Sequence, residues 1–229
     1  MNDIKYFYSQ NHFPGPYSID QLKKYDIDAN RYIKLIDQYI TNKSRVLDIG
    51  CGTGLLTNLF ALNYSSTFLG IDFSTAADYA NKFAIDNHIN NASFVKQDFF
   101  KFKTKDKFNI IIAQSFLTHV PDYEQAVAKI KQLLAPNGVI ILGMFHPAGK
   151  LIKNKFKVNY GSDRLQLDQK FNPFEQAFSK SQVIKMFKEY ELLKITPSLG
   201  NHLVWLMNLA NAKNGGLTMY VFKDSKHGH

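Results

Sequence analysis

Short apolar runs alternate with longer amphipathic segments through the first two thirds of the chain. The runs have the length of buried strands, and the segments between them repeat apolar positions every three to four residues, as helices do. This pattern predicts strands at 45–49, 67–71, 92–96, 108–113 and 138–144, and helices at 55–62, 75–87 and 123–134. Strands alternating with helices are typical of a parallel sheet covered by helices on both faces.

The segments outside this region are less regular. Two prolines around Gly15 forbid a helix there, whereas Ser18 and Gln21 have the spacing of a capping box. No internal repeat and no Ser/Gly linker divides the chain, so 1–229 is predicted to form one domain whose second half continues the sheet. The remaining expectations are helices at 28–40 and 179–190, strands at 191–196 and 217–223, an undecided element at 203–209, a basic stretch without clear periodicity at 146–172 and a frayed tail at 226–229.

The composition supports a single domain with a large core. Of the 229 residues, 45% are hydrophobic and 21% are charged, which is ordinary for a globular protein. Cys51 is the single cysteine, so an intrachain disulfide framework and a multi-cysteine metal centre are excluded, and we expect no metal site. No apolar run is long enough to span a bilayer, and residues 1–10 lack the pattern of a secretory signal. We therefore expect a cytoplasmic protein.

The net charge of +9 raises the question of nucleic-acid binding. Only Arg31, Arg45 and Arg164 are arginines, and the other basic residues are lysines, which lack the bidentate fork that grips phosphates and guanine edges. The lysines accompany many Asn, Ile, Phe and Tyr residues, whose codons are AT-rich. Compositional drift explains the charge better than RNA binding, although the lysine-rich segments 101–107 and 150–157 are suited to contact phosphates.

The most informative stretch is the run Val-Leu-Asp-Ile-Gly-Cys-Gly-Thr-Gly at 46–54, where a predicted strand enters a glycine loop and a helix leaves it. A dinucleotide fingerprint would be G-x-G-x-x-G, but here the third glycine comes one residue early, at Gly54. Asp48 would also repel the pyrophosphate of a dinucleotide. A cationic ligand without phosphate, such as S-adenosylmethionine, fits this charge better.

Two further acids follow the next two predicted strands. Asp72 ends the second strand, where a carboxylate can accept hydrogen bonds from both ribose hydroxyls. Asp98 follows the third strand, where it can accept one from an adenine amino group. Because the carboxyl ends of parallel strands meet at one crevice, we expect the three acids to lie together. A single aspartate at such a place is usually a turn or cap residue, but three in succession indicate a ligand site.

These motifs and those that follow resemble the class I S-adenosylmethionine-dependent methyltransferases. The resemblance covers about 30–145 and is carried by VLDIGCGTG, FLGIDFS (68–74), VKQDFF (95–100), FNIIIAQSFLTHVPD (108–122) and LLAPNGVIIL (133–142). It implies an α/β, Rossmann-like, seven-stranded mixed sheet in the order 3-2-1-4-5-7-6, with helices on both faces and the last strand antiparallel. It also implies S-adenosyl-L-methionine as cofactor and S-adenosyl-L-homocysteine as product.

The resemblance assigns roles in cofactor binding. The loop glycines surround the methionine part, Asp48 steers its ammonium, partly through water, and Gln114 meets that ammonium through its backbone carbonyl. Asp72 holds the ribose, Phe73 packs on adenine, and Asp98 and the Phe99 amide address the adenine edge. Cys51 lies within the loop, where a small filler is the better explanation than a nucleophile. The predicted cofactor residues are Asp48, Gly50, Cys51, Gly52, Gly54, Asp72, Phe73, Asp98, Phe99 and Gln114.

The methyl acceptor is less defined by the sequence. After the fourth strand the chain lacks the Asn/Asp-Pro-Pro-Tyr/Phe motif and a Pro-Cys nucleophile, and its Phe-Leu-Thr-His-Val-Pro-Asp stretch resembles the small-molecule branch of the family. His119 and His146 follow strand ends and are the candidate bases, with packing and turn roles as the alternatives. The extension 1–30 is expected to act as a lid, with Tyr8, Phe13 and Tyr17 near the acceptor, and 146–180 to be a substrate-side insertion.

The functional prediction is therefore methyl transfer to an O, N or C nucleophile of a small molecule. An RNA or protein methyltransferase on the same fold is the first alternative. A non-catalytic S-adenosylmethionine-binding protein and a nucleotide-dependent oxidoreductase are the others. The sequence does not define an oligomeric state.

Overall fold

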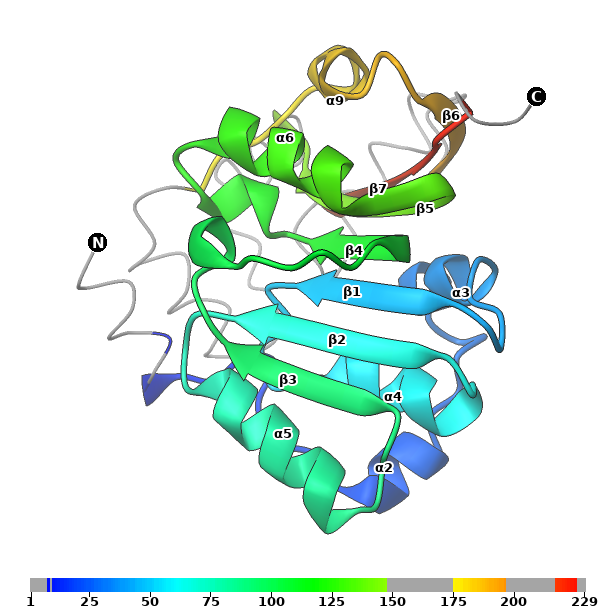
Figure 1. The fold of residues 1–229 in the computed structure, drawn as a ribbon, viewed down its shortest axis with the longest axis vertical. Coiled ribbons are helices and arrows are strands. Elements are labelled where there is room, and N and C mark those ends of the chain that lie inside the picture. The colour runs from blue at the N-terminus through cyan, green and yellow to red at the C-terminus, as the bar shows by residue number, and fades with distance from the viewer. Residues whose placement is uncertain (1–7, 9, 148–174, 197–216, 226–229) are drawn as a thin grey trace, which may run out of the picture.

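The computed structural model describes residues 8, 10–147, 175–196 and 217–225, and the expectations for 148–172, 203–209 and 226–229 lie outside these residues. Seven strands form one sheet in the order β3-β2-β1-β4-β5-β7-β6, which confirms the predicted topology (Figure 1). Neighbouring strands from β3 to β5 run parallel, and β7 is antiparallel to both β5 and β6. The strands are β1 (Arg45–Ile49), β2 (Thr67–Asp72), β3 (Ala92–Lys96), β4 (Phe108–Gln114), β5 (Leu134–Phe145), β6 (Glu191–Thr196) and β7 (Leu217–Lys223).

Strand β5 begins earlier than the sequence predicts. Leu134 already pairs with Phe108, and the regular register resumes where Val139 pairs with Ile110. The Pro-Asn-Gly stretch at 136–138 is therefore an irregularity within the strand, where Asn137 has a positive φ of 60°. The proline and glycine in this stretch indicate a break in regular structure, but they do not reveal that pairing begins before it.

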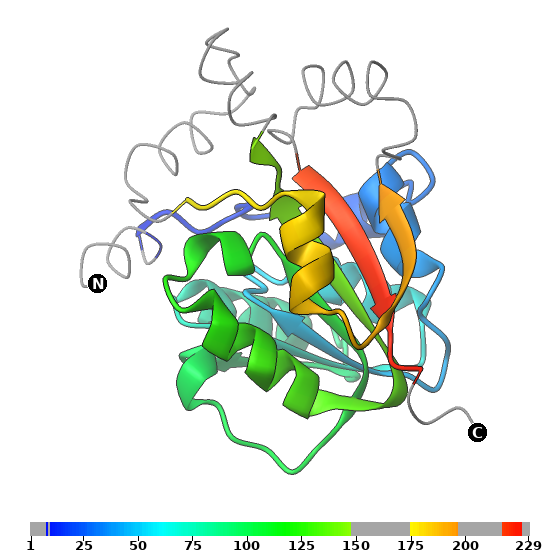
Figure 2. The ribbon, with the colours of Figure 1, turned by 90° about the horizontal axis from the view of Figure 1, so that it is seen from above.

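Helices cover both faces of the sheet, as predicted. The helices α3 (Arg31–Asp37), α4 (Leu55–Asn63) and α5 (Ala76–Asp86) pack on one face. The helices α6 (Tyr123–Leu133) and α9 (Lys180–Met186) pack on the other, and Figure 2 shows α9 and α3 on opposite sides of β7. Both α3 and α9 are shorter than the apolar pattern predicts. The Asn30 side chain caps the first turn of α3, so that helix begins after its predicted start, whereas α9 begins as predicted after its cap, Ser179. Both helices end earlier than predicted, at Asp37 and Met186.

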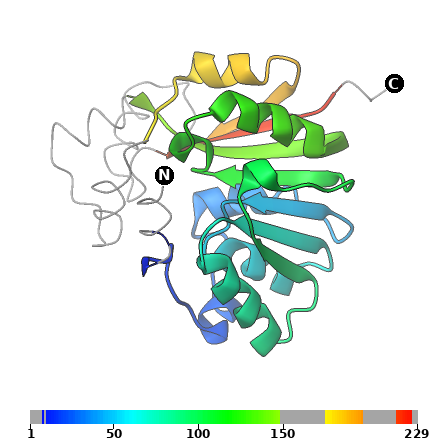
Figure 3. The ribbon, with the colours of Figure 1, turned by 60° about the vertical axis from the view of Figure 1, so that its left-hand side comes forward.

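The described N-terminal residues end in a short helix, α2 (Ile19–Lys23). Ser18 and Gln21 form the predicted capping box at the start of this helix. The described residues before α2, drawn in dark blue, lie on the side where β1 to β4 end (Figure 3). Among the described residues, no helix is long and apolar enough to cross a membrane.

The strand order places a topological switch point at β1. The chain leaves β1 towards β2 in one direction along the sheet and later returns to β4 on the other side of β1. At such a switch point the loops after adjacent strands diverge and leave room for a ligand beyond the strand ends. The strand register places the ends of β1, β2 and β4 level with one another. Asp48 pairs with Gly70 of β2 and with Ile112 of β4. Two residues further on, Gly50 therefore lies level with Asp72 on one side and with Gln114 on the other.

Candidate active site

The glycine loop after β1 turns sharply at three successive positions. Gly50, Gly52 and Gly54 have φ values of 74°, 54° and 73°, a conformation that side chains other than glycine rarely adopt. At Gly52, an added Cβ would stand 2.1 Å from the carbonyl oxygen of Phe13, so the N-terminal segment requires glycine there as well. Gly50 is exposed, and an added Cβ would meet only the Phe116 ring at ordinary contact distance.

Every backbone N–H of the loop has a partner inside the protein. Gly50 and Cys51 donate to the Ile71 carbonyl at 2.8 and 3.2 Å, and Gly54 donates to the Cys51 carbonyl at 2.9 Å. Thr53 donates to the Phe13 carbonyl at 2.9 Å, and Gly52 donates to Oδ2 of Asp72 at 3.0 Å. A phosphate-binding loop must instead direct its amides at the ligand. This loop is therefore not organised to hold a phosphate.

Asp48 is buried beneath the loop on the face of the sheet that α4 covers. Its side chain is 5% exposed, and its Oδ2 accepts a 2.7 Å hydrogen bond from the Thr57 hydroxyl in the first turns of α4. Burial raises the pKa of this carboxyl to about 6, and the nearby Asp72 acts in the same direction, whereas the Thr57 hydrogen bond lowers it. A cation above the loop would stabilise the charged form of Asp48.

Asp72 joins the end of β2 to the loop. Its Oδ1 accepts hydrogen bonds from the Ser74 amide at 2.8 Å and the Ser74 hydroxyl at 2.7 Å, while its Oδ2 accepts from Gly52. These bonds fix the carboxylate at the strand end. Each carboxylate oxygen has further acceptor capacity, so the fixed group can still receive hydroxyl donors.

Asp98 follows β3 and caps the 3₁₀ turn η1 (Phe99–Lys101). Its Oδ1 accepts a hydrogen bond from the Phe100 amide at 3.0 Å. The Gln97 amide donates to the Asp72 carbonyl at 2.8 Å, which holds the end of β3 beside the end of β2. The structure thus brings the ends of the three acid-bearing strands together at one edge of the sheet.

Aromatic rings border these acids. Phe73 is half-buried and contacts Tyr8 edge to face, with 5.8 Å between ring centroids. Phe99 is buried and contacts Phe116 in the same way at 5.2 Å. Phe116 follows the end of β4 and lies against Gly50, so it connects the turn after β3 to the glycine loop.

Gln114 ends β4 next to Gly143 of β5. Directly after it, Ser115 adopts a positive φ of 59°, which is uncommon for a residue other than glycine. The Thr118 hydroxyl donates to the Ser115 carbonyl at 2.6 Å and stabilises this turn. The backbone therefore bends away immediately after Gln114, at the level of the glycine loop.

Cys51 is buried, and its sulfur lies 2.8 Å from the position that an added Cβ on Gly70 would take. Burial raises the pKa of this thiol well above its usual value, and the carboxylates of Asp48 and Asp72 raise it further. A thiol that resists ionisation is a poor nucleophile. The geometry therefore favours a packing role for Cys51.

The segment at residues 12–17 binds the outside of the glycine loop; we call it the strap. Besides the bond from the Phe13 carbonyl, the Gly15 carbonyl accepts from the Thr53 hydroxyl at 3.1 Å. The Tyr17 hydroxyl donates to the Thr53 carbonyl at 2.7 Å and accepts from the Asn58 side chain at 3.0 Å. All three polar groups of Thr53 are therefore held by the strap.

The strap also contacts α5. The His12 ring lies within hydrogen-bond distance, 2.8 Å, of the Thr75 hydroxyl, and the Tyr17 ring packs on Phe83 with 4.5 Å between centroids. Tyr17 is thus an anchor of the strap, and burial raises the pKa of its hydroxyl strongly. Phe13 differs, because its side chain is 43% exposed.

The two candidate bases follow the carboxyl ends of β4 and β5. His119 ends the 3₁₀ turn η2 (Leu117–His119) and contacts the Phe145 ring edge to face at 5.9 Å. His146 follows Phe145 directly and is half-buried. Burial lowers the pKa of His146 below its usual 6.5, so the ring is neutral at neutral pH and able to accept a proton.

Several residues that organise the site were not singled out from the sequence: Thr53, Thr57, Asn58, Ser74 and Phe116. Thr57 carries a recognisable signal, since it lies on the first turns of the helix that leaves the loop and faces β1. Thr53 and Asn58 carry none, because their partners are 36 or more residues away in the chain.

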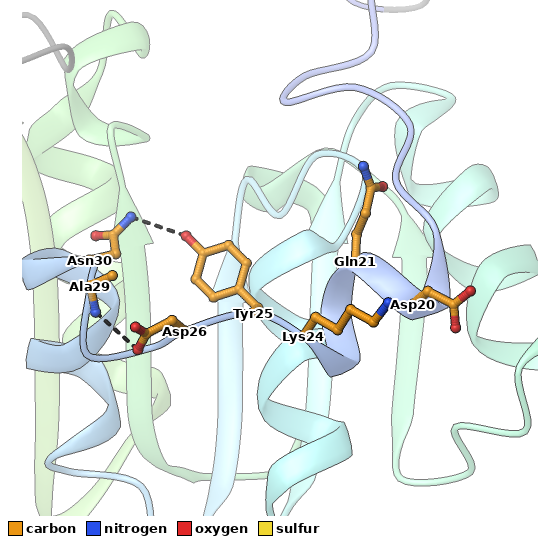
Figure 4. A pocket seen from close by; sticks show the side chains of 7 residues that line it. All are labelled: Asp20, Gln21, Lys24, Tyr25, Asp26, Ala29 and Asn30. Atoms are coloured by element: carbon orange, nitrogen blue, oxygen red, sulfur yellow. Dashed lines mark hydrogen bonds between the residues drawn. The ribbon is translucent and has the colours of Figure 1, made fainter.

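A surface pocket of about 630 Å³ lies elsewhere, between α2 and the start of α3 (Figure 4). Its lining includes Asp26, which accepts from the Ala29 amide, and Tyr25, which accepts from Asn30. None of the predicted site residues lines it. Within the described ranges, no group of three His, Cys, Asp or Glu side chains is arranged to hold a metal ion.

Comparisons with known proteins agree with this geometry. A family model described as a methyltransferase domain matches residues 40–196. The chain therefore belongs to this family of methyltransferase domains, and the resemblance to class I S-adenosylmethionine-dependent methyltransferases is confirmed.

Individual relatives are more distant. A ubiquinone biosynthesis O-methyltransferase of Pasteurella multocida is 36% identical over 107 residues, 42% of this chain and 44% of that protein. A malonyl-[acyl-carrier protein] O-methyltransferase of Calditerrivibrio nitroreducens is 31% identical over 120 residues, 51% and 45% of the two chains. The matches thus span under half the length of these curated relatives. The N-methyltransferase NodS of Bradyrhizobium japonicum, solved with S-adenosyl-L-homocysteine, has a TM-score of 0.65 at 15% identity, covering 99% of this chain and 100% of that one.

Proposed function

We propose that the protein transfers the methyl group of S-adenosyl-L-methionine, by in-line displacement, to an O, N or C nucleophile of a small molecule. The observation that carries this proposal is the glycine loop, whose amides are all paired inside the protein above a buried carboxylate. A pyrophosphate at this loop would have no free backbone amide to bind and would lie close to the Asp48 carboxylate. This argument opposes the oxidoreductase alternative.

The residues present fit the proposed cofactor. Asp48 matches the ammonium of its methionine part, and the fixed carboxylate of Asp72 matches the two ribose hydroxyls. Phe73 offers a ring face to adenine, and Asp98 retains an oxygen for the adenine amino group. Gln114, level with Gly50 in the sheet, is placed to meet the ammonium through its backbone carbonyl.

The bound cofactor supplies an electrophilic methyl group, so the protein has to orient the acceptor behind that group and exclude water. The aromatic side chains of Tyr8, Phe13 and Phe116 are suited to both tasks. An acceptor hydroxyl or ammonium must also lose a proton, and His146, neutral and half-buried, is the first candidate to take it. His119, whose ring contacts Phe145, is the second candidate.

We further propose that the chain works as a single domain with residues 1–30 as a lid and 146–180 as a substrate-side insertion. The strap supports the first part, because residues 12–17 are tied to the loop that would hold the cofactor. Deletion of residues 1–17 should abolish turnover, and unchanged methyl transfer by the truncated protein would contradict a lid role. A cytoplasmic location belongs to the same proposal.

The acceptor is proposed to be small because the named relatives include an enzyme of ubiquinone biosynthesis. The alternative acceptors, RNA and protein, draw support from the exposed Lys101, Lys103 and Lys105. Tritium transfer from labelled S-adenosylmethionine to a panel of phenols, carboxylic acids, amines, tRNA and protein tests the choice. Label in a small molecule, without salt-sensitive tRNA binding, is expected. Label found in tRNA or protein alone would contradict the small-molecule proposal, and no transfer to any acceptor would favour the non-catalytic alternative.

A further inference from the structure

Lys129, on α6, occupies an unusual position beneath the turn that follows β3. Its ammonium donates to the carbonyl oxygens of Phe99 at 2.6 Å, Phe100 at 2.9 Å and Phe102 at 2.6 Å. An ammonium has three N–H donors, and here three carbonyl groups surround it. The same nitrogen lies 5.1 Å from the centroid of the Phe99 ring, in a cation–π contact.

These carbonyls belong to the segment that would address adenine. The turn η1 begins at Phe99, so the Phe99 amide has no partner within the turn. Asp98 caps the turn with one carboxylate oxygen and leaves the other for a ligand. The direction in which both groups point depends on the conformation of the turn.

The buried rings of Phe99 and Phe102 anchor this turn in the core, and Lys129 adds the hydrogen bonds to its carbonyls. Its internal bonds run from Lys101 and Phe102 back to Asp98, and a turn of three residues has weak hydrogen-bond geometry of its own. Burial lowers the pKa of Lys129, while Asp98 raises it, so the ammonium and the carboxylate interact through the turn. The Phe99 ring packs against the Phe116 ring, and Phe116 in turn lies against Gly50 of the glycine loop.

We propose that Lys129 is a positioning residue that fixes the adenine-reading turn and thereby sets the selectivity of the site for a 6-amino purine. This inference rests on the proposed function, since it assumes that the nucleoside of the cofactor lies beside Asp98. Lys129 itself touches backbone and a ring, and it reaches the base only through Asp98 and Phe99.

Lys131 provides a matched control two residues along the same helix. Its ammonium also donates to a carbonyl, that of Met186, and to the Glu189 carboxylate at 2.6 Å. It also lies over rings, 5.2 Å from the centroid of Phe187 and 5.8 Å from that of Tyr190. Its hydrogen-bond and ring partners all lie at the end of α9 or in the segment after it, beyond α6 in Figure 1, whereas those of Lys129 lie in and around η1.

The test compares the dissociation constants of S-adenosylhomocysteine and S-inosylhomocysteine, in which an oxygen replaces the 6-amino group. The wild-type protein should prefer the adenine compound, because Asp98 accepts from an amino group and repels a carbonyl oxygen. Lys129→Met should weaken S-adenosylhomocysteine about tenfold and reduce the preference, since the loss of a charge-assisted hydrogen bond has this size. Lys131→Met should lower the melting temperature while leaving both constants unchanged, and Lys129→Arg should restore the preference.

The outcomes separate this inference from the proposed function. If the wild-type protein binds S-adenosylhomocysteine and Lys129→Met retains the full purine preference, the positioning role is wrong. If Lys129→Met folds poorly, Lys129→Gln, which keeps two N–H donors, serves as the second variant. A full purine preference in Lys129→Gln would likewise show that the positioning role is wrong. Failure of the wild-type protein to bind S-adenosylhomocysteine at all would overturn both proposals together.

Discussion

Replacement of Asp48 by Asn should stabilise the ligand-free protein and weaken its cofactor binding. Folding raises the pKa of this buried carboxyl from 3.8 to about 6. The fold therefore favours the protonated form, so the stability that this group contributes is present below pH 3.8 and is lost as the pH rises through about 6. The difference corresponds to roughly 3 kcal/mol at pH 8. Asn is neutral and still accepts the hydrogen bond from Thr57.

Urea unfolding of the ligand-free proteins measures this effect. At pH 8, Asp48→Asn should increase the free energy of unfolding by up to about 3 kcal/mol, and the increase should shrink towards zero as the pH falls to about 4. The exposed Asp106, which pairs with Arg45, provides the control, because its replacement by Asn should change the free energy by less than about 0.5 kcal/mol.

Binding should change in the opposite direction. Loss of a charge-assisted contact with the cofactor ammonium should weaken S-adenosylhomocysteine about 10- to 100-fold. A variant that is less stable than the wild-type protein at pH 8, or one that binds S-adenosylhomocysteine with unchanged affinity, would refute the reasoning about Asp48.

Three further predictions follow from the strap and the candidate base. Both Gly50 and Gly52 have positive φ, but only a Cβ at Gly52 would collide with the strap. Gly52→Ala should therefore lower the free energy of unfolding by at least about 1 kcal/mol more than Gly50→Ala does, and equal losses in urea unfolding would contradict this. Tyr17→Phe should cost about 1–3 kcal/mol, whereas Tyr39→Phe, which removes no hydrogen bond to the loop, should have little effect on the melting temperature. The acid limb of kcat against pH should have its midpoint below 6.5 and should disappear in His146→Asn; an unchanged limb would exclude His146 as the base.

The strands at the centre of the sheet could be predicted because they are buried on both faces. Such strands are continuous apolar runs, and the first two runs end at a glycine or an aspartate, as in 45–49 before Gly50 and 67–71 before Asp72. The carboxyl ends of parallel strands meet at one edge of the sheet. The neighbouring positions of Asp48 and Asp72 could therefore be predicted from the strand assignment.

The contacts that organise the loop could not be predicted in the same way. The strap binds Thr53 through two backbone carbonyls and one hydroxyl, all from positions 36 or more residues away. No periodic pattern marks a carbonyl as an acceptor, and the same holds for the three carbonyls around Lys129. The sequence indicated that Tyr17 lies near the site, whereas the structure shows that its ring is packed against α5.

The central claim is that the glycine loop selects a cationic, phosphate-free nucleoside, because its amides are paired internally and its carboxylate is buried. Calorimetric titration of the full chain with S-adenosylhomocysteine and, separately, with NADH tests this claim most directly. The account predicts saturable binding of S-adenosylhomocysteine and no heat of binding with NADH. Saturable binding of NADH, with none of S-adenosylhomocysteine, would contradict it.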